Sequence, residues 1–308
     1  MATECGTRTT KGGRWYGITR RACGIAKTAE PMSDRRLTPA NGRVAATYLK
    51  GVIAAADYLD GIKASVVAPV VDLCAAPNGA RDRQLKLGAE VNVLEDRDGW
   101  SFIQAALDGY VGYVRSDTLG EVTSPTHMVA TSATHAYLAE NMKSEDVLAL
   151  PFGAAVVVVD ERHKFFETTV GYVPKKHLRP LTQTFTDPAT IAQMHYGVPY
   201  LWGGNSTRGI DCSGLVQSSL TACGIYCPAD SDMQLVETGV ALLDDASLQR
   251  GDLMFWKGHV GIMVDADTMI HANAHHMACV YEPIKAAILR IKAQGDGDVL
   301  ARKRLAGA

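Results

Sequence analysis

Two similar blocks in the first 180 residues constrain the fold more than any other feature of the chain. The tripeptide Gly-Tyr-Val at 112–114 recurs at 171–173, and a leucine follows each copy at the same offset, Leu119 and Leu178. Around both copies, short alternating apolar runs are separated by Asx-Gly turns, a pattern typical of small β-barrels. Two matching blocks predict two copies of one barrel rather than a long repeat array.

Changes in composition and residue pattern along the chain divide it into four predicted segments. Residues 1–34 are rich in Arg and Lys, and no apolar core of an export signal follows, so we expect a disordered or mis-started tail. Residues 35–122 should hold a short helix at 42–50 and the first barrel. Residues 123–182 should form the second barrel, and 183–308 an α+β domain.

Composition excludes several classes of function. The formal net charge of -2 over 308 residues argues against nucleic acid as the main partner, and no apolar stretch approaches the roughly 20 residues of a membrane helix. The seven cysteines are odd in number and scattered, which favours a reducing compartment over a disulfide framework. Without a secretory signal, the expected location is cytoplasmic.

The segment around Cys212 predicts a buried helix with a thiol in its first turn. Asp211 is a good N-cap residue, and Leu215, Val216 and Leu220 form a helical apolar stripe after it. A thiol in the first turn feels the positive end of the helix dipole, which favours the thiolate nucleophile. A lone cysteine is also often a small buried packing residue, and that alternative stays open at this point.

A base for this thiol is available downstream. His259 opens a predicted strand and His271 lies on the next one, twelve positions later, across a short connection. Antiparallel neighbours would bring the two imidazoles into contact. We expect His271 to accept the Nδ1 proton of His259 and to leave Nε2 facing the thiol. The helices and strands expected in this domain are helices at 187–196, from Cys212 and at 283–293, and strands near 252–256, 259–264, 268–272 and 278–282.

Metal sites are disfavoured by spacing. Cys223 and Cys227 have no second pair at zinc-ligand spacing. On a strand, His271 and His275 share a face while His276 points away, and no carboxylate follows at ligand spacing. The sequence therefore predicts no metal and no cofactor, and these histidines should support the rim of a cleft.

The last 120 or so residues resemble the NlpC-type cysteine peptidases of bacterial cell-wall metabolism. The stretches that carry this resemblance are Tyr-Leu-Trp-Gly-Gly at 200–204, Gly-Ile-Asp-Cys-Ser-Gly-Leu-Val-Gln at 209–217, Gly-Asp-Leu at 251–253, Gly-His-Val-Gly at 258–261 and Ile-His-Ala-Asn at 270–273. The block at 98–119 resembles bacterial SH3-like domains. The resemblance implies a papain-like core with Cys212, His259 and His271 as catalytic residues, and paired SH3-like domains before it.

Residues 64–295 together are similar to γ-D-glutamyl-L-diamino acid endopeptidases, which recycle cell-wall peptides. The resemblance implies a murein-peptide substrate with a free N-terminal L-alanine, which an acidic residue of the cleft would bind. By position, the residues that would bind substrate or support the oxyanion are Tyr200, Asp211, Ser213, Asp230 and Ser231. Asp82 and Tyr110 could line the amine site, although both could equally be surface loop residues.

Two other functions compete with this hypothesis. The SH3-like pair could bind wall peptides while the papain-like domain is silent, which the intact set of Cys212, His259 and His271 disfavours. A related amidase or acyltransferase would use the same thiol in another reaction. The sequence does not indicate an oligomeric state.

Overall fold

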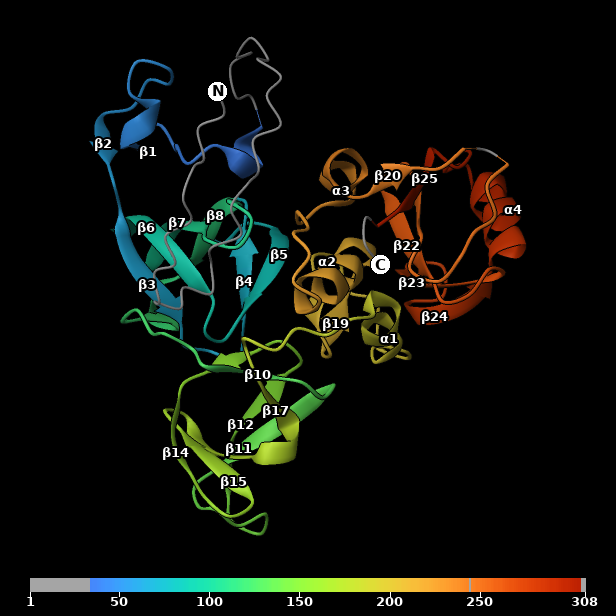
Figure 1. Ribbon diagram of the computed structural model, residues 1–308. Helices are drawn as coiled ribbons and strands as arrows, with labels where there is room; N and C mark the ends of the chain where they lie inside the picture. Colours follow the sequence, from blue (N-terminus) through green and yellow to red (C-terminus); the bar gives the residue numbers. More distant parts are fainter. Residues whose placement is uncertain (1–33, 244, 306–308) are drawn as a thin grey trace, which may run out of the picture.

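The computed structural model describes residues 34–243 and 245–305, so the predicted tail at 1–34 lies outside the described residues except for its last residue, Asp34. The described chain forms a short N-terminal segment followed by three units, each with its own sheet (Figure 1). The two β units lie one above the other, and the C-terminal α+β unit lies beside them (Figure 1). The segment boundaries named above stay a prediction.

The prediction of a helix at 42–50 is wrong. This stretch forms a strand, β1 (Val44–Ala46), which pairs in parallel with β2 (Asp57–Leu59), and only a single 3-10 turn, η2 (Thr47–Leu49). Side chains of β1 and η2 are buried against Phe102 and other residues of the first β unit. A helix this short is marginal in water, so packing against the neighbouring unit decided its conformation.

The first β unit is a seven-stranded sheet with strand order β5-β4-β8-β7-β6-β3-β9 and antiparallel pairing throughout. Its strands are β3 (Ile62–Val66), β4 (Val70–Cys74), β5 (Arg81–Lys86), β6 (Glu90–Arg97), β7 (Trp100–Ala105), β8 (Val111–Arg115) and β9 (Leu119–Gly120). The turn between β6 and β7 uses Asp98 and Gly99, both at positive φ (53° and 76°), as expected of an Asp-Gly hairpin.

The second β unit has two sheets, of three and five strands, in the orders β13-β10-β17 and β12-β11-β16-β15-β14. Its strands are β10 (His127–Val129), β11 (Ala133–Tyr137), β12 (Asp146–Pro151), β13 (Ala155–Val156), β14 (Val158–Glu161), β15 (Phe165–Thr168), β16 (Gly171–Pro174) and β17 (Leu178–Pro180).

The repeat seen in the sequence corresponds to a repeated structure. In each β unit the Gly-Tyr-Val strand, β8 or β16, is followed by a 3-10 turn, η3 (Ser116–Thr118) or η4 (Lys175–His177). Each turn ends at the matching leucine, which begins β9 or β17. The two units thus share this succession of elements, while the description of the second as SH3-like stays a prediction.

The C-terminal unit surrounds a six-stranded antiparallel sheet with the order β20-β25-β21-β22-β23-β24. Its strands are β20 (Val240–Ala241), β21 (Leu253–Trp256), β22 (His259–Met263), β23 (Thr268–Asn273), β24 (Ala278–Pro283) and β25 (Ala301–Arg304), with a separate pair β18 (Asn205–Ser206) and β19 (Gly209–Ile210). Its helices are α1 (Pro188–Gln193), α2 (Cys212–Ala222), α3 (Ser231–Glu237) and α4 (Ile284–Gln294). The predicted helices and strands of this unit are confirmed.

The sheet lies between two helical layers. Helix α2 packs on β22 and β23, with α1 beside it, around an apolar core that includes Leu215, Phe255 and Ile270. Helix α4 covers the opposite face through Ile284 and Ile291. Among the described residues, no helix is both long and apolar enough to cross a bilayer.

Candidate active site

Cys212 is the first residue of α2, as the sequence predicts, and it is nearly enclosed, with 7% of its surface exposed. The Asp211 carboxylate caps the helix by accepting the backbone N–H of Gly214 at 2.7 Å and the Ser213 hydroxyl at 3.1 Å. Its other oxygen accepts the N–H of Gly203 at 2.9 Å. Asp211 therefore ties the preceding loop to the helix start, and its hydrogen bonds are made within the protein.

The loop before Cys212 approaches the helix too closely for any side chain at position 214. A Cβ there would lie 2.4 Å from the backbone oxygen of Gly204. Glycine at this position allows the loop at 203–204 to pass directly over the first turn of α2. This contact fixes the position of the thiol relative to the loop.

The protonation of Cys212 differs from the expectation drawn from its position. Burial raises the pKa of the Cys212 thiol to about 12, assisted by the neighbouring Asp211 carboxylate. The backbone amides of Ser213 and Val260 pull the pKa down but do not outweigh burial. The thiolate expected from the helix dipole is thus not favoured at this buried position. Removing the negative charge from water destabilises the thiolate more than the helix dipole stabilises it.

The backbone on both sides of His259 contacts the Cys212 sulfur. The Cys212 Sγ lies 3.9 Å from the carbonyl oxygen of Gly258, and the N–H of Val260 acts on the same sulfur. Burial lowers the pKa of His259 to about 3, and the adjacent His271 lowers it further. A neutral imidazole can accept a proton, so His259 is in the state that a general base requires.

The predicted contact between the two imidazoles is present, but through the other nitrogen. Strands β22 and β23 are antiparallel neighbours, and His259 Nε2 lies 2.8 Å from His271 Nδ1. The expected arrangement, with Nδ1 of His259 bonded and Nε2 facing the thiol, is therefore wrong. The contact with His271 occupies Nε2 of His259, so the base proposed for Cys212 has to act through Nδ1.

A carboxylate that the sequence analysis missed continues this chain of contacts. Glu282, at the end of β24, places Oε2 3.0 Å from His271 Nε2. Arg290 of α4 holds both oxygens of Glu282, at 2.8 and 2.7 Å. Burial opposes ionisation of Glu282, but the hydrogen bonds from Arg290 and His271 prevail and hold its pKa well below its usual range. No local signal marks Glu282, since only the pairing of β23 with β24 brings it to His271.

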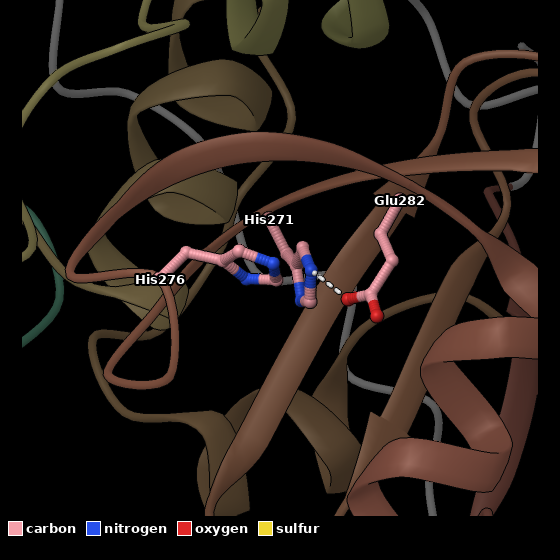
Figure 2. A group of neighbouring side chains, drawn as sticks. All are labelled: His271, His276 and Glu282. Carbon is pink, nitrogen blue, oxygen red and sulfur yellow. Dashed lines mark hydrogen bonds and ion pairs between the residues drawn. The ribbon is translucent and has the colours of Figure 1, made fainter.

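The histidines after β23 are also arranged differently from the expectation. His276, not His275, turns toward His271, and Figure 2 shows both rings beside Glu282. The donor atoms of His271, His276 and Glu282 all lie within 4.8 Å of one another. The sequence argument assumed a continuous strand, whereas the chain turns after Asn273 and carries His276 back over the site.

Tyr200 packs against the same core cluster as Cys212. Burial raises the pKa of its phenol, and the neighbouring Cys212 and Asp211 raise it further. The phenol therefore stays a neutral hydrogen-bond donor at any ordinary pH. Of the two tryptophans of this unit, Trp202 is 69% exposed and Trp256 is buried.

A small pocket joins the first β unit to the helix start of the C-terminal unit. It is lined by Asp82 from β5 and by Gly203, Asp211, Ser213 and Asp230 from the C-terminal unit. Four of the predicted substrate-binding residues thus lie around one space. Ser231 begins α3 immediately after Asp230.

Tyr110 and two arginines complete the acidic end of this pocket. The Tyr110 hydroxyl lies 3.1 Å from Asp230 Oδ2 and is buried rather than in a surface loop. Arg36 donates to the same oxygen at 2.6 Å, and Arg35 donates to both oxygens of Asp82, at 2.7 and 3.0 Å. The arginines come from η1 (Arg35–Leu37), a contact that no sequence pattern indicated.

Two family models match this chain. The model of the NlpC/P60 family matches residues 197–290, which include Cys212, His259, His271 and Glu282. The chain contains an NlpC/P60 domain. The model of the bacterial dipeptidyl-peptidase SH3 domain matches residues 73–119, in the first β unit. This domain content is that of hydrolases that act on peptide bonds.

Curated relatives match more than half of this chain. The γ-D-glutamyl-L-lysine dipeptidyl-peptidase of Bacillus subtilis is 30% identical over 53% of this chain, which spans 60% of that relative's length. Dipeptidyl-peptidase 6 of Lysinibacillus sphaericus is 24% identical over 69% of this chain and 88% of the relative. The crystal structure of an NlpC/P60 family protein from Bacillus cereus has the same fold, with a TM-score of 0.67 and 20% identity over 79% of this chain and 99% of that one.

Proposed function

We propose that this chain is a cysteine peptidase that hydrolyses the γ-D-glutamyl–L-diamino acid bond of cell-wall peptides with a free N-terminal L-alanine. The observation that carries the proposal is the acidic pocket, shared by two units, beside the helix start that holds Cys212. The name of the Bacillus subtilis relative, γ-D-glutamyl-L-lysine dipeptidyl-peptidase, supports the same class of substrate, and that of the Lysinibacillus sphaericus relative supports a dipeptidyl-peptidase.

In the proposed reaction, Nδ1 of His259 takes the proton of Cys212 as the sulfur attacks the γ-carbonyl carbon. The developing oxyanion would accept hydrogen bonds from the helix-start amide of Cys212 and from the Tyr200 hydroxyl. The tetrahedral intermediate collapses to a thioester, and His259 passes the proton to the leaving amine of the diamino acid. Water, activated by His259, then hydrolyses the thioester.

Glu282 has a defined part in this proposal, as a positioning residue. A carboxylate can only accept hydrogen bonds, and as a charged partner Glu282 outweighs the Asn273 Nδ2 donor 3.1 Å from the same nitrogen, so His271 carries its proton on Nε2. His271 Nδ1 is then an acceptor, and His259 must donate from Nε2. This leaves an unprotonated Nδ1 on His259, the state that a general base for Cys212 requires.

The acidic end of the pocket is suited to an amine. Arg35 and Arg36 contact four carboxylates, those of Asp34, Asp82, Asp230 and Asp232, so the cluster has four negative and two positive charges and keeps two negative charges in excess. Such an excess attracts the ammonium group of a free N-terminal alanine. A requirement for this group would restrict the enzyme to peptides already released from glycan, as in cell-wall recycling.

The experiment that tests the proposal compares two peptides. L-Ala-γ-D-Glu-diaminopimelate should be cleaved between glutamate and the diamino acid, and its N-acetylated form should show kcat/KM lower by about 10- to 100-fold. Asp230→Asn should reduce this preference, whereas Asp232→Asn, on the more exposed neighbour, should largely keep it. Binding without turnover would favour a peptide-binding protein, and cleavage of an N-acetylmuramoyl amide instead would favour an amidase.

Replacement of Glu282 by glutamine is expected to lower kcat by up to about 10²-fold and to leave KM nearly unchanged. The amide can accept from His271 or donate to it, so both imidazoles would populate the wrong tautomer. Ring 15N chemical shifts of His259 and His271 report these tautomers directly. Glu95→Gln is the matched control, because Glu95 is also a largely buried carboxylate held by an arginine, Arg43, but lies in the first β unit. A lower kcat with unchanged ring shifts would argue against the positioning role.

A further inference from the structure

The rim of the proposed active site holds an unassigned set of metal-ligating side chains. His271, His276 and Glu282 offer two imidazole nitrogens and a carboxylate oxygen within 4.8 Å of one another (Figure 2). Two histidines and a glutamate are a donor set that zinc uses at sites with an open fourth position. Bound ligand atoms around tetrahedral zinc lie about 3.3–3.5 Å apart, so the side chains need to close by only about an ångström.

The position of the free histidine nitrogen suits a metal. Asn273 Oδ1 accepts the backbone N–H of His276 at 2.9 Å and lies 3.0 Å from His276 Nδ1. With Nδ1 of His276 donating to this oxygen, its Nε2 is unprotonated and available as a ligand. His271 and Glu282 are buried while His276 is exposed, so an ion could enter from the His276 side. The exposed ring on its turn is also the ligand best able to move.

The charges around the set permit binding but limit its strength. Arg290 donates from Nε to Oε1 of Glu282 and from Nη2 to Oε2. Zinc would take Oε2, and Arg290 would keep Oε1 together with Gln294 Oε1, its second partner at 2.7 Å. The nearby guanidinium opposes a cation, which suits a reversible site rather than a permanent structural one.

We propose that His271, His276 and Glu282 form an inhibitory zinc site. Zinc on His271 Nε2 replaces the hydrogen bond to Glu282, so the remaining proton of His271 moves to Nδ1. That nitrogen then donates to Nε2 of His259, whose own proton moves to Nδ1, with no net loss of protons. His259 would then present N–H to Cys212 and could not accept the thiol proton. The inhibitory consequence rests on the proposed function, whereas zinc binding itself does not.

Direct binding of zinc chloride to the full chain without an affinity tag tests the site. Cys212→Ala, measured by calorimetry, should still bind one zinc ion, since the thiol is not a ligand. Adding His276→Gln to this variant should weaken binding about tenfold or more. Adding His275→Gln is the matched control and should leave binding unchanged, because the His275 ring packs beside His276 but its Nδ1 contacts Gln294 Nε2 at 2.8 Å instead of the site. Cobalt titration should show the visible bands of a tetrahedral site in Cys212→Ala and in its His275→Gln derivative, and much weaker bands in its His276→Gln derivative.

Turnover gives the second measurement. Zinc should inhibit the wild-type chain reversibly, with recovery on addition of EDTA. His276→Gln should keep kcat without zinc and need about tenfold more zinc for half-inhibition. Loss of binding in Cys212→Ala would place the ion on the thiol and overturn the proposal, as would equal weakening by His275→Gln and His276→Gln. If the chain binds zinc as expected but cleaves no peptide, the proposed function is refuted. The proposed metal site would still be supported.

Discussion

Replacing Cys212 by alanine is expected to lower kcat by roughly 10⁴- to 10⁶-fold, the largest effect of any single change in this chain. The sulfur is the only atom of the proposed site that would bond covalently to the substrate, and no neighbouring group can replace it. Affinity for the peptide should persist, because the acidic pocket at Asp82 and Asp230 is untouched. Steady-state turnover and calorimetric binding of the peptide measure the two quantities separately.

Cys223→Ser provides the control for this experiment. Cys223 ends the same helix, α2, is a free thiol like Cys212 and is only half-buried. It should therefore keep its turnover. If Cys212→Ala retained measurable cleavage while Cys223→Ser lost it, the assignment of the nucleophile would be wrong.

Replacing Asp108 by alanine is expected to reduce the free energy of unfolding by about 3–5 kcal/mol. Asp108 and Arg83 are an ion pair whose side chains are 1% and 6% exposed, at the contact of the first β unit with α2. Gln217 of α2 joins both, at 2.8 Å from Arg83 Nη2 and 2.8 Å from Asp108 Oδ2. Removing the carboxylate leaves a buried guanidinium without its counter-charge. Urea unfolding followed by fluorescence measures the loss.

Two further variants separate this cost from a general effect of removing charge. The double variant Arg83→Met with Asp108→Leu should recover much of the loss, because apolar groups can replace a buried pair. Glu90→Gln breaks the exposed pair with Lys63 and should cost less than about 1 kcal/mol. Similar losses for Asp108→Ala and Glu90→Gln would contradict a dominant role for burial.

The sequence predicted the parts of the site that depend on neighbours along the chain. Cys212 was found because an N-cap residue and an apolar stripe at helical spacing surround it. The contact of His259 with His271 was found because a short connection makes their strands adjacent. The repeated Gly-Tyr-Val blocks likewise marked two β units, since each strand and its following turn are local structure.

The errors and omissions share one cause. The stretch at 42–50 became β1 and η2 because it packs against the first β unit, and its helix propensity was too weak to resist. Which nitrogen of His259 contacts His271 depends on the orientation of the ring, which only the pairing of the two strands determines. His276 was misplaced because the turn after Asn273 breaks the strand alternation on which the argument relied.

Sequence alone determined which residue could be the nucleophile, which could be its base, and how many units precede them, because helix starts, hairpins and repeats are encoded over a few adjacent residues. Tertiary structure decided that Glu282, held by Arg290, contacts His271. It also decided that Tyr110 and Arg36 contact Asp230. These contacts join residues far apart in the chain. They form only when strands pair in register and the units dock, which depends on packing over the whole molecule.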